Sequence, residues 1–593
     1  MNINKGTNMI KKSRWMMVIC LSFIICLSFS PVRAQSLTVT VDSVGQLAGK
    51  LPDDIRYTMS ELKICGPLNG SDLKIVQAIA NRLRQKKNNE KVLTTLDLSE
   101  ATIEDGKGSF RTRKGVLPAA LFINCKTLES ISLPDGITEI SRSCFSGCVG
   151  LKEVSIPETT LIIGDYAFNG CTSLTELSLP ESLTTIENHA FDGCTSITTL
   201  AIPENVTLID ASAFNNCKML EEIELACKVN RISNDSFNGC EQLKKIELPE
   251  TVTFIGEEAF KNCKSLKSIQ MPEALSEIGS NAFENCLSLD SIAIGTATRI
   301  GSETFSGCTS LASATIKNTS RMGDAAFQNC SSLVTVSIDG NLQVINSETF
   351  MNCTSLSAIS LPGTVRTIGD YAFFDCKSLE QIELPASLAK INDHAFEQCS
   401  SLKSLFIPNL TKELGSDTFK NCTSLDSVYI QGFVEELEND VFRYCHSLRV
   451  IILPVTIKSI DDNAFEQCTS LSVIDLPISV KKIGDSAFEK CVSLTTMNVP
   501  AACTTIGSAA FRECSGLKRV EFPAALKKIN SNAFAKCVSL QEIASNAPTP
   551  PSITHSTFKG VVLSACRVFI PKGSKNHYHN DKLWKKMPQI IEQ

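Results

Sequence analysis

The chain has 593 residues, a formal net charge of −6, six histidines and two tryptophans. The small net charge excludes the broad basic field that nucleic-acid binding needs. The few histidines and tryptophans leave little material for catalysis or base stacking, so we predict neither a nucleic-acid partner nor an enzyme.

The first 34 residues have the pattern of a secretory signal peptide. Basic residues at 11, 12 and 14 precede an apolar run over 15–29, and residues 32–34 offer small side chains for cleavage. A membrane anchor is the weaker alternative, because the run is shorter than the ~20 residues that span a bilayer. No later stretch is apolar enough to span a membrane. The sequence predicts an exported mature chain without a transmembrane segment.

Residues 35–115 are predicted to form an N-terminal cap with atypical repeats. Ser71 is a suitable N-cap for an amphipathic helix, and residues 93–103 match the general pattern L-x-x-L-x-L-x-x-N-x-L with Ala101 in the asparagine position. A repeat array needs such a cap, because the open end of its core must be covered.

Residues 116–545 repeat a unit of 23 residues. A cysteine recurs nineteen times from Cys125 to Cys537, with phenylalanine three residues before each and leucine, once isoleucine, three residues after each. The spacing falls to 22 only at the two steps between Cys286 and Cys330. Self-similarity at this period predicts a leucine-rich solenoid, here of about nineteen coils.

Each unit is predicted to contain one short parallel strand. In a representative unit, Ile474 and Leu476 alternate with Asp475, which predicts that the two apolar side chains point inward and Asp475 outward. Pro477 lacks an N–H group and should end the strand. The return half, which includes Ala487-Phe488, is predicted to be a short helical or 3₁₀ turn. The predicted fold class is therefore an α/β solenoid.

Three consecutive units depart from the repeat pattern. The units that follow Cys286 carry Gly295, Lys317 and Asp339 in place of the proline, and two of them are one residue short. We expect a change of curvature or twist there.

Residues 546–593 are predicted to be a degenerate repeat and a C-terminal cap. Phe558 is the last residue that matches the phenylalanine position of the repeat, and Tyr578 and Trp584 follow on a short basic tail. These two aromatic side chains should plug the end of the core.

The unit L-P-x-x-V-x-x-I-G-x-x-A-F-x-x-C-x-x-L resembles the bacterial leucine-rich repeat of the Bacteroides surface protein A-like type, also called the Treponema pallidum type. The resemblance covers residues 116–545. It implies an exported, surface-associated or secreted protein, with adhesion to host matrix proteins or to other cells as the activity of some members. It carries over no catalytic residues.

The nineteen regularly spaced cysteines raise the alternatives of disulfides or a metal site. Equivalent Cβ atoms in stacked coils lie about 4.8 Å apart, outside the ~3.5–4.5 Å that a disulfide prefers. An odd number also leaves one cysteine unpaired. We expect reduced, buried thiols that act as small apolar side chains, about twenty-four of which react only after denaturation.

Histidines offer no clear metal site in the sequence. His577-Tyr578-His579 has no carboxylate or cysteine cluster beside it, which favours a solvated tail. His189 and His394 occupy the same repeat position, which places both on the return side and not in a joint site. No phosphate loop, nucleophile elbow or spaced zinc motif is present. We therefore predict no catalytic residues, no cofactor and no metal.

The outward strand positions are the expected binding surface, because packing fixes the core positions. Phe406, Tyr429 and Ile452 occupy the outward position in consecutive units, and Val450 and Val473 lie two residues earlier in theirs. Five large apolar side chains on one open face would form a contiguous patch, and such patches mark binding sites. The unit after Cys422 also lacks the proline and reads Gln431-Gly432-Phe433 there. The alternative is that this unit folds over the patch and buries it.

A second, acidic stretch consists of Glu221, Glu222, Glu224 and Glu247, and we interpret it as a solvated face. The predicted function is an exported, non-enzymatic binding or adhesion scaffold that recognises a protein or glycan on its repeat face, on host matrix or on another cell surface. The alternative is a structural or self-associating cell-envelope protein, in which the apolar patch meets a second copy.

Overall fold

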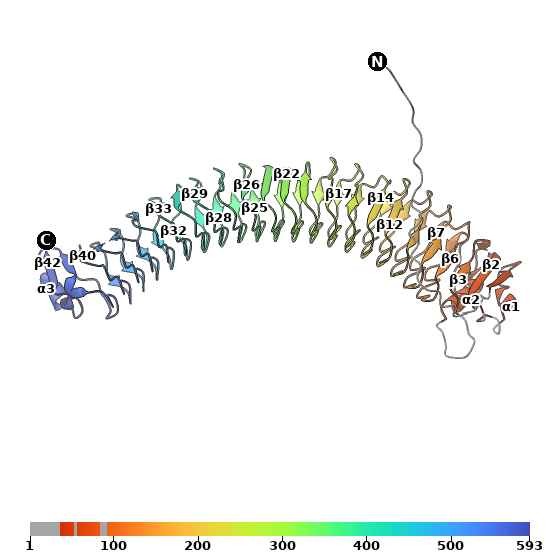
Figure 1. The fold of residues 1–593 in the computed structure, drawn as a ribbon, viewed down its shortest axis with the longest axis horizontal. Coiled ribbons are helices and arrows are strands. Elements are labelled where there is room, and N and C mark those ends of the chain that lie inside the picture. Colours follow the sequence, from red (N-terminus) through yellow and green to blue (C-terminus); the bar gives the residue numbers. More distant parts are fainter. Residues whose placement is uncertain (1–35, 53–55, 58, 83–91) are drawn as a thin grey trace, which may run out of the picture.

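The computed structural model describes residues 36–52, 56–57, 59–82 and 92–593 (Figure 1). The predicted signal peptide lies outside the described residues. The described chain is one elongated arc of stacked coils, with the N-terminal elements at one end and the C-terminal elements at the other (Figure 1). Among the described residues, no helix is both long and apolar enough to cross a membrane.

Every repeat places its alternating segment on one side of the coil, and most of these segments form a strand. The prediction of a strand in each unit was wrong for two segments, residues 381–384 and the representative segment 474–476, which form none. The strands pair in parallel and in register, so that Leu405, Val428 and Ile451 lie side by side in three consecutive coils. The strands of this first series, in chain order, are β1 Ser36–Thr40, β2 Glu61–Leu68, β3 Thr95–Asp97, β6 Ser130–Ser132, β8 Glu153–Ser155, β10 Glu176–Leu177, β12 Thr199–Ile202, β14 Glu222–Leu225, β16 Lys245–Ile246, β18 Ser268–Ile269, β20 Ser291–Ile294, β22 Ser313–Thr319, β24 Thr335–Gly340, β26 Ala358–Ser360, β29 Ser404–Ile407, β31 Ser427–Ile430, β33 Val450–Ile452, β36 Thr496–Asn498, β38 Arg519–Phe522, β40 Glu542–Ser545, β41 Arg567–Ile570 and β42 Gln589–Glu592.

The return half of each unit contains a second strand of two residues, which the sequence did not predict. These strands also pair in parallel with their neighbours along the arc, as Ile460 does with Ile483. They are β5 Val116–Leu117, β7 Glu139–Ile140, β9 Ile162–Ile163, β11 Thr185–Ile186, β13 Leu208–Ile209, β15 Arg231–Ile232, β17 Phe254–Ile255, β19 Glu277–Ile278, β21 Arg299–Ile300, β23 Arg321–Met322, β25 Val344–Ile345, β27 Thr367–Ile368, β28 Lys390–Ile391, β30 Glu413–Leu414, β32 Glu436–Leu437, β34 Ser459–Ile460, β35 Lys482–Ile483, β37 Thr505–Ile506 and β39 Lys528–Ile529.

The predicted helical turn in the return half was wrong. Ala487-Phe488 lies between Ser486 and Lys490, whose φ angles of 53° and 60° are left-handed. Two left-handed residues so close together are incompatible with a right-handed helical turn. The N–H of Phe488 instead donates to the carbonyl of Ala510 in the next coil, at 2.7 Å. The return half is therefore held by hydrogen bonds between coils as well as by bonds within its own turn, such as that from the N–H of Glu489 to the carbonyl of Ser486 at 3.0 Å.

The α-helices of the described chain all lie in its terminal segments, so the α/β class was also wrong. They are α1 Leu47–Lys50, α2 Gly70–Ala80 and α3 Lys575–Asn580. The count of nineteen coils was too low as well. β1, β2 and β3 add three coils before the regular repeats, and β41 and β42 add two after them, which gives about 24 turns.

The N-terminal helix begins two residues earlier than the sequence predicted. The side chain of Asn69, not Ser71, is the N-cap, and its Oδ1 accepts hydrogen bonds from the backbone N–H groups of Ser71 and Asp72. The Asp72 carboxylate accepts in return from the N–H of Asn69, which completes a capping box. Asparagine is at least as good an N-cap as serine, so composition alone does not separate the two.

Loss of the proline lengthens two strands in the irregular units. β22 and β24 have seven and six residues, and they include Lys317 and Asp339 at the position where proline ends other strands. Their pairing shifts register between Ile316 and Thr319. Gly295 directly follows β20 and does not extend it. The irregularity is thus seen as longer strands with a register shift, and the expected change of curvature stays a prediction.

Two regular columns of side chains run through the core beside its buried leucine and isoleucine side chains. Twenty phenylalanines from Phe122 to Phe558 stack ring on ring, with centroids 5.0 to 5.7 Å apart and interplanar angles of 0° to 18°. Beside them, the eighteen repeat cysteines from Cys148 to Cys537 each donate an S–H hydrogen bond to the carbonyl of the phenylalanine in the preceding coil, at 3.0 to 3.3 Å. The thiol is therefore a small core side chain that also satisfies a buried carbonyl.

The C-terminal cap closes the phenylalanine column. Trp584 is buried and packs edge-on against both Phe558 and Tyr578, and its indole N–H donates to the carbonyl of Pro551. The hydroxyl of Tyr578 donates to the carbonyl of Ala547. Buried aromatic groups with satisfied polar atoms are well suited to this place. The predicted aromatic plug agrees with this packing.

The cysteines of the described chain are free, and all but one of them are buried. We predict that at most one of the described thiols, that of Cys65, reacts fast in the native protein, because this side chain is half-buried. Titration with a thiol reagent, before and after unfolding in denaturant, checks the prediction. The remaining thiols should react only after unfolding, and fast reaction of several thiols in the native protein would contradict it.

Candidate functional site

The predicted patch lies open on the first strand series. Register pairs Phe406 of β29 with Tyr429 of β31, and Tyr429 with Ile452 of β33, so the three side chains form a row across adjacent strands. Val450 lies on the same face of β33, and Val473 occupies the equivalent position in the next coil. All five side chains are exposed, between 40% and 54%. The unit after Cys422 therefore does not fold over these five side chains.

Four further apolar side chains, which the sequence reasoning missed, extend this surface. Leu410, Phe433, Val455 and Ile478 lie in the turns that directly follow the alternating segments of the same four coils, and they are 52% to 82% exposed. The sequence showed these large apolar residues one or two positions after the proline position of each unit. We call the nine side chains together the apolar strip. Its members are Phe406, Leu410, Tyr429, Phe433, Val450, Ile452, Val455, Val473 and Ile478.

Charged pairs lie beside the apolar strip, at the positions just before the strands. Lys403 forms an ion pair with Glu380 at 2.5 Å, and Arg449 forms one with Asp426 at 3.5 Å. All four side chains are exposed, so the pairs contribute little to stability. An apolar centre with a polar, solvated border is the usual anatomy of a protein interface.

Phe433 also borders a groove on the other side of the turn. The groove has a volume of about 1050 Å³ and is lined mainly by charged side chains of the second strand series, among them Glu413, Glu436 and Glu438. Burial, followed by the nearby Asp461 and Glu436, raises the pKa of Glu438. The groove is therefore acidic where the apolar strip is neutral.

The acidic stretch near β14 is partly neutralised. Glu221 pairs with Lys244 and Glu247 with Lys245, both at 2.5 Å, and all four side chains are exposed. The hydrogen bond from Lys245 lowers the pKa of Glu247. These contacts agree with the interpretation as a solvated face.

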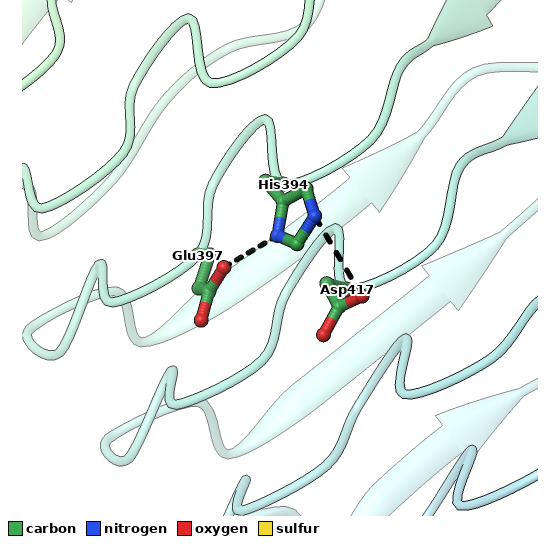
Figure 2. A group of neighbouring side chains, drawn as sticks. All are labelled: His394, Glu397 and Asp417. Carbon is green, nitrogen blue, oxygen red and sulfur yellow. Dashed lines mark hydrogen bonds and ion pairs between the residues drawn. The ribbon is translucent and has the colours of Figure 1, made fainter.

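One histidine has neighbours that the sequence reasoning did not bring together. Figure 2 shows His394 between two carboxylates: its Nδ1 lies 2.6 Å from Glu397 Oε2, and its Nε2 lies 3.8 Å from Asp417 Oδ2. Glu397 follows three residues later, and Asp417 is the equivalent of His394 in the next coil. The signal in the sequence was one carboxylate three residues after His394 and another 23 residues after it. His189 lies nine coils away and forms no joint site with His394.

Parallel strands stacked in register over a leucine-rich core define a leucine-rich repeat solenoid, with an exposed apolar surface on four of its coils. The model of the BspA-type leucine-rich repeat region matches residues 116–244, 230–356, 320–449 and 435–563. The chain belongs to this family, as its repeat unit predicted.

Solved structures give further similarity. A leucine-rich repeat protein from Bacteroides ovatus is 22% identical, with 82% of this chain and 97% of that chain covered and a TM-score of 0.35. The Treponema pallidum leucine-rich repeat protein is 29% identical, with 33% and 82% covered and a TM-score of 0.26. A leucine-rich cell surface protein from Faecalibacterium prausnitzii is 23% identical, with 59% and 87% covered and a TM-score of 0.30. No curated protein matches the chain.

Proposed function

We propose that the chain is an exported, non-enzymatic adhesion scaffold that captures a protein or glycan through the apolar strip. The observation that carries the proposal is the gathering of nine exposed, large apolar side chains on four consecutive coils. A soluble repeat array has no packing reason to keep such residues in its outward positions, because its core is complete without them.

The geometry of the apolar strip suits a rigid binding surface. Phe406 and Tyr429 stand on paired strands whose backbones are fixed by interstrand hydrogen bonds, so little conformational entropy is lost when they contact a ligand. Aromatic side chains are frequent anchors in protein interfaces. Their flat faces also suit the apolar faces of sugar rings, which keeps both ligand classes within the proposal.

The proposed location and organisation rest on sequence. The basic, apolar and small-residue pattern of residues 1–34 supports export, and the BspA-type family supports a place at the cell surface or outside it. We assign residues 35–115 to an N-terminal cap, 116–545 to the regular solenoid and 546–593 to a degenerate repeat and C-terminal cap. Host matrix or another cell surface is the proposed source of the ligand.

The test is the double substitution Phe406→Ser with Tyr429→Ser in the mature chain, probed against an array of matrix proteins and glycans. We expect capture to fall below detection while circular dichroism and the unfolding temperature stay unchanged, because both side chains are exposed. Leu161→Ser with Leu208→Ser, two exposed leucines far from the apolar strip, is the matched control and should capture as the wild type does. Unaltered capture by the first variant would show that the ligand binds another face.

Self-association is the second candidate, because a second copy could cover the same apolar strip. Light scattering separates the two functions. A wild-type dimer that the Phe406→Ser and Tyr429→Ser change converts to a monomer would favour a structural envelope protein, and a monomeric wild type that captures ligand would favour the scaffold.

A further inference from the structure

His394 is held between carboxylates on both ring nitrogens (Figure 2). Glu397 is 7% exposed, and His394 and Asp417 are half-buried, so water only partly screens the three groups. Two elements supply them: His394 and Glu397 come from one turn, and Asp417 comes from the turn of the next coil. The stacking of coils fixes their spacing, so the arrangement is preorganised.

A neutral imidazole cannot satisfy both carboxylates. It has one N–H group and one nitrogen lone pair, so only one of its nitrogens can donate. The short contact of 2.6 Å identifies Nδ1 as the donor to Glu397. Nε2 then points its lone pair toward Asp417 Oδ2 at 3.8 Å, which is repulsive unless a cation lies between them.

The distances fit a metal ion at that position. Ligand bonds of ~2.0–2.1 Å to Zn²⁺ at a tetrahedral angle place neighbouring ligand atoms about 3.3 Å apart. The separation of 3.8 Å between Nε2 and Oδ2 requires only a small closure. A histidine that ligates through one nitrogen usually donates from the other to a carboxylate, which fixes its tautomer and orientation. Glu397 already makes this contact.

The neighbouring charges leave the space between His394 Nε2 and Asp417 Oδ2 open to a cation. Lys420 Nζ pairs with the other oxygen of Asp417, Oδ1, at 2.6 Å and lies 4.0 Å from Glu397, so Oδ2 stays available. The ring of Tyr371 stacks on His394 with centroids 4.4 Å apart.

We propose that this group binds a divalent transition-metal ion of the Zn²⁺ type, with His394 Nε2 and Asp417 Oδ2 as ligands, Glu397 as the orienting acceptor, and water in the remaining positions. Imidazole nitrogen with carboxylate oxygen suits Zn²⁺ and its neighbours in the first transition row. The site departs from the sequence-based expectation of no metal, and it is independent of the apolar strip.

The chain contains a natural comparison for this site. His189 has equivalent partners: Asp192 of its own coil lies 3.2 Å from its Nδ1, and Tyr166 of the preceding coil stacks on its ring at 4.6 Å. The equivalent of Asp417 in the next coil is Ser212, which offers no carboxylate. The proposal therefore assigns metal binding to His394 and not to His189.

The test is calorimetric titration of ZnCl₂ into the mature chain near neutral pH, with a non-thiol reductant. We expect wild type to bind one ion that Asp417→Ser and His394→Gln do not bind. Glu397→Gln should weaken binding at least ~10-fold, as the loss of an outer-shell partner does. Lys420→Gln should tighten binding several-fold, because it removes a nearby positive charge. Circular dichroism of each variant confirms its fold.

His189→Gln is the matched control and should bind as the wild type does. Titration of Co²⁺ gives an independent readout, because its visible absorption should appear in the wild type and be lost in Asp417→Ser. Isotherms that are the same for the wild type, His394→Gln and Asp417→Ser would overturn the proposal. A wild type that binds no ion would overturn it as well.

Discussion

Unfolding of the solenoid should become much easier as the pH rises above about 8.5, with the urea midpoint falling steeply toward pH ~10. The cause is the cysteine column. Burial raises the pKa of the Cys240, Cys308 and Cys537 thiols to about 12. It also raises the pKa of further buried repeat thiols, such as Cys194 and Cys468.

The sign follows from proton binding. In the unfolded chain a thiol ionises near pH ~8.5, whereas in the fold it stays protonated up to its raised pKa. Between these two values the unfolded chain binds fewer protons, so the free energy of unfolding falls by ~1.4 kcal/mol per pH unit for each buried thiol. The stabilisation is complete below about pH 8.5. Five coils that unfold together would lose ~7 kcal/mol per pH unit, which is comparable to the whole stability of a typical domain, ~5–15 kcal/mol.

Urea unfolding followed by circular dichroism at a series of pH values checks this, with a reductant present to prevent oxidation. Cys445→Ala is the matched variant. It should be less stable at neutral pH, because it leaves a small cavity and removes one of the two hydrogen bonds that the Phe419 carbonyl accepts, yet it should show a shallower dependence on pH. A midpoint that does not move between neutral and alkaline pH would rule out buried, protonated thiols as a stabilising feature.

The sequence predicted burial in the alternating segment of each coil, because the pattern there lies within a few neighbouring residues. Ile474 is buried and Asp475 exposed, as the alternation of apolar and polar residues required. Burial of the cysteines was also predicted, since a cysteine between phenylalanine and leucine in every unit reads as core. The hydrogen bond from each thiol to the preceding coil was not predicted, because it depends on how one coil is placed on the next.

The return half shows why the rest could not be predicted. One left-handed position of its turn carries residues as different as Ser143, Tyr166 and Glu258, so no residue type marks that position. The other, just before each repeat cysteine, is glycine or asparagine in most units, as at Gly147 and Asn262, and this signal was not used. The two-residue strands, such as Lys482–Ile483, are too short to show alternation. Contacts between coils fix both features, and a pattern within one unit does not carry them. The same holds for His394 and Asp417, which only the stacking register brings together.

Replacement of Phe442 by alanine should divide the array into two parts that unfold separately. Phe442 is fully buried, and its ring stacks between Phe419 and Phe465 with centroids 5.5 Å from each. Removal of a buried phenylalanine side chain costs ~3–5 kcal/mol. Each coil contacts only its neighbours, so this loss weakens two adjacent interfaces and no others.

Calorimetry and amide hydrogen exchange check this expectation. The variant should show a second, lower unfolding transition, and the coils next to Phe442 should exchange fastest, whereas the N-terminal coils keep their wild-type protection. Phe433→Ala is the matched control, because this phenylalanine is 60% exposed in the adjoining turn, and its loss should change stability by less than ~0.5 kcal/mol. Equal effects of the two substitutions would mean that the stacked column does not hold neighbouring coils together. A large effect of Phe442→Ala alone would locate the stability of the solenoid in the column of rings, and leave the exposed aromatic side chains free to serve binding.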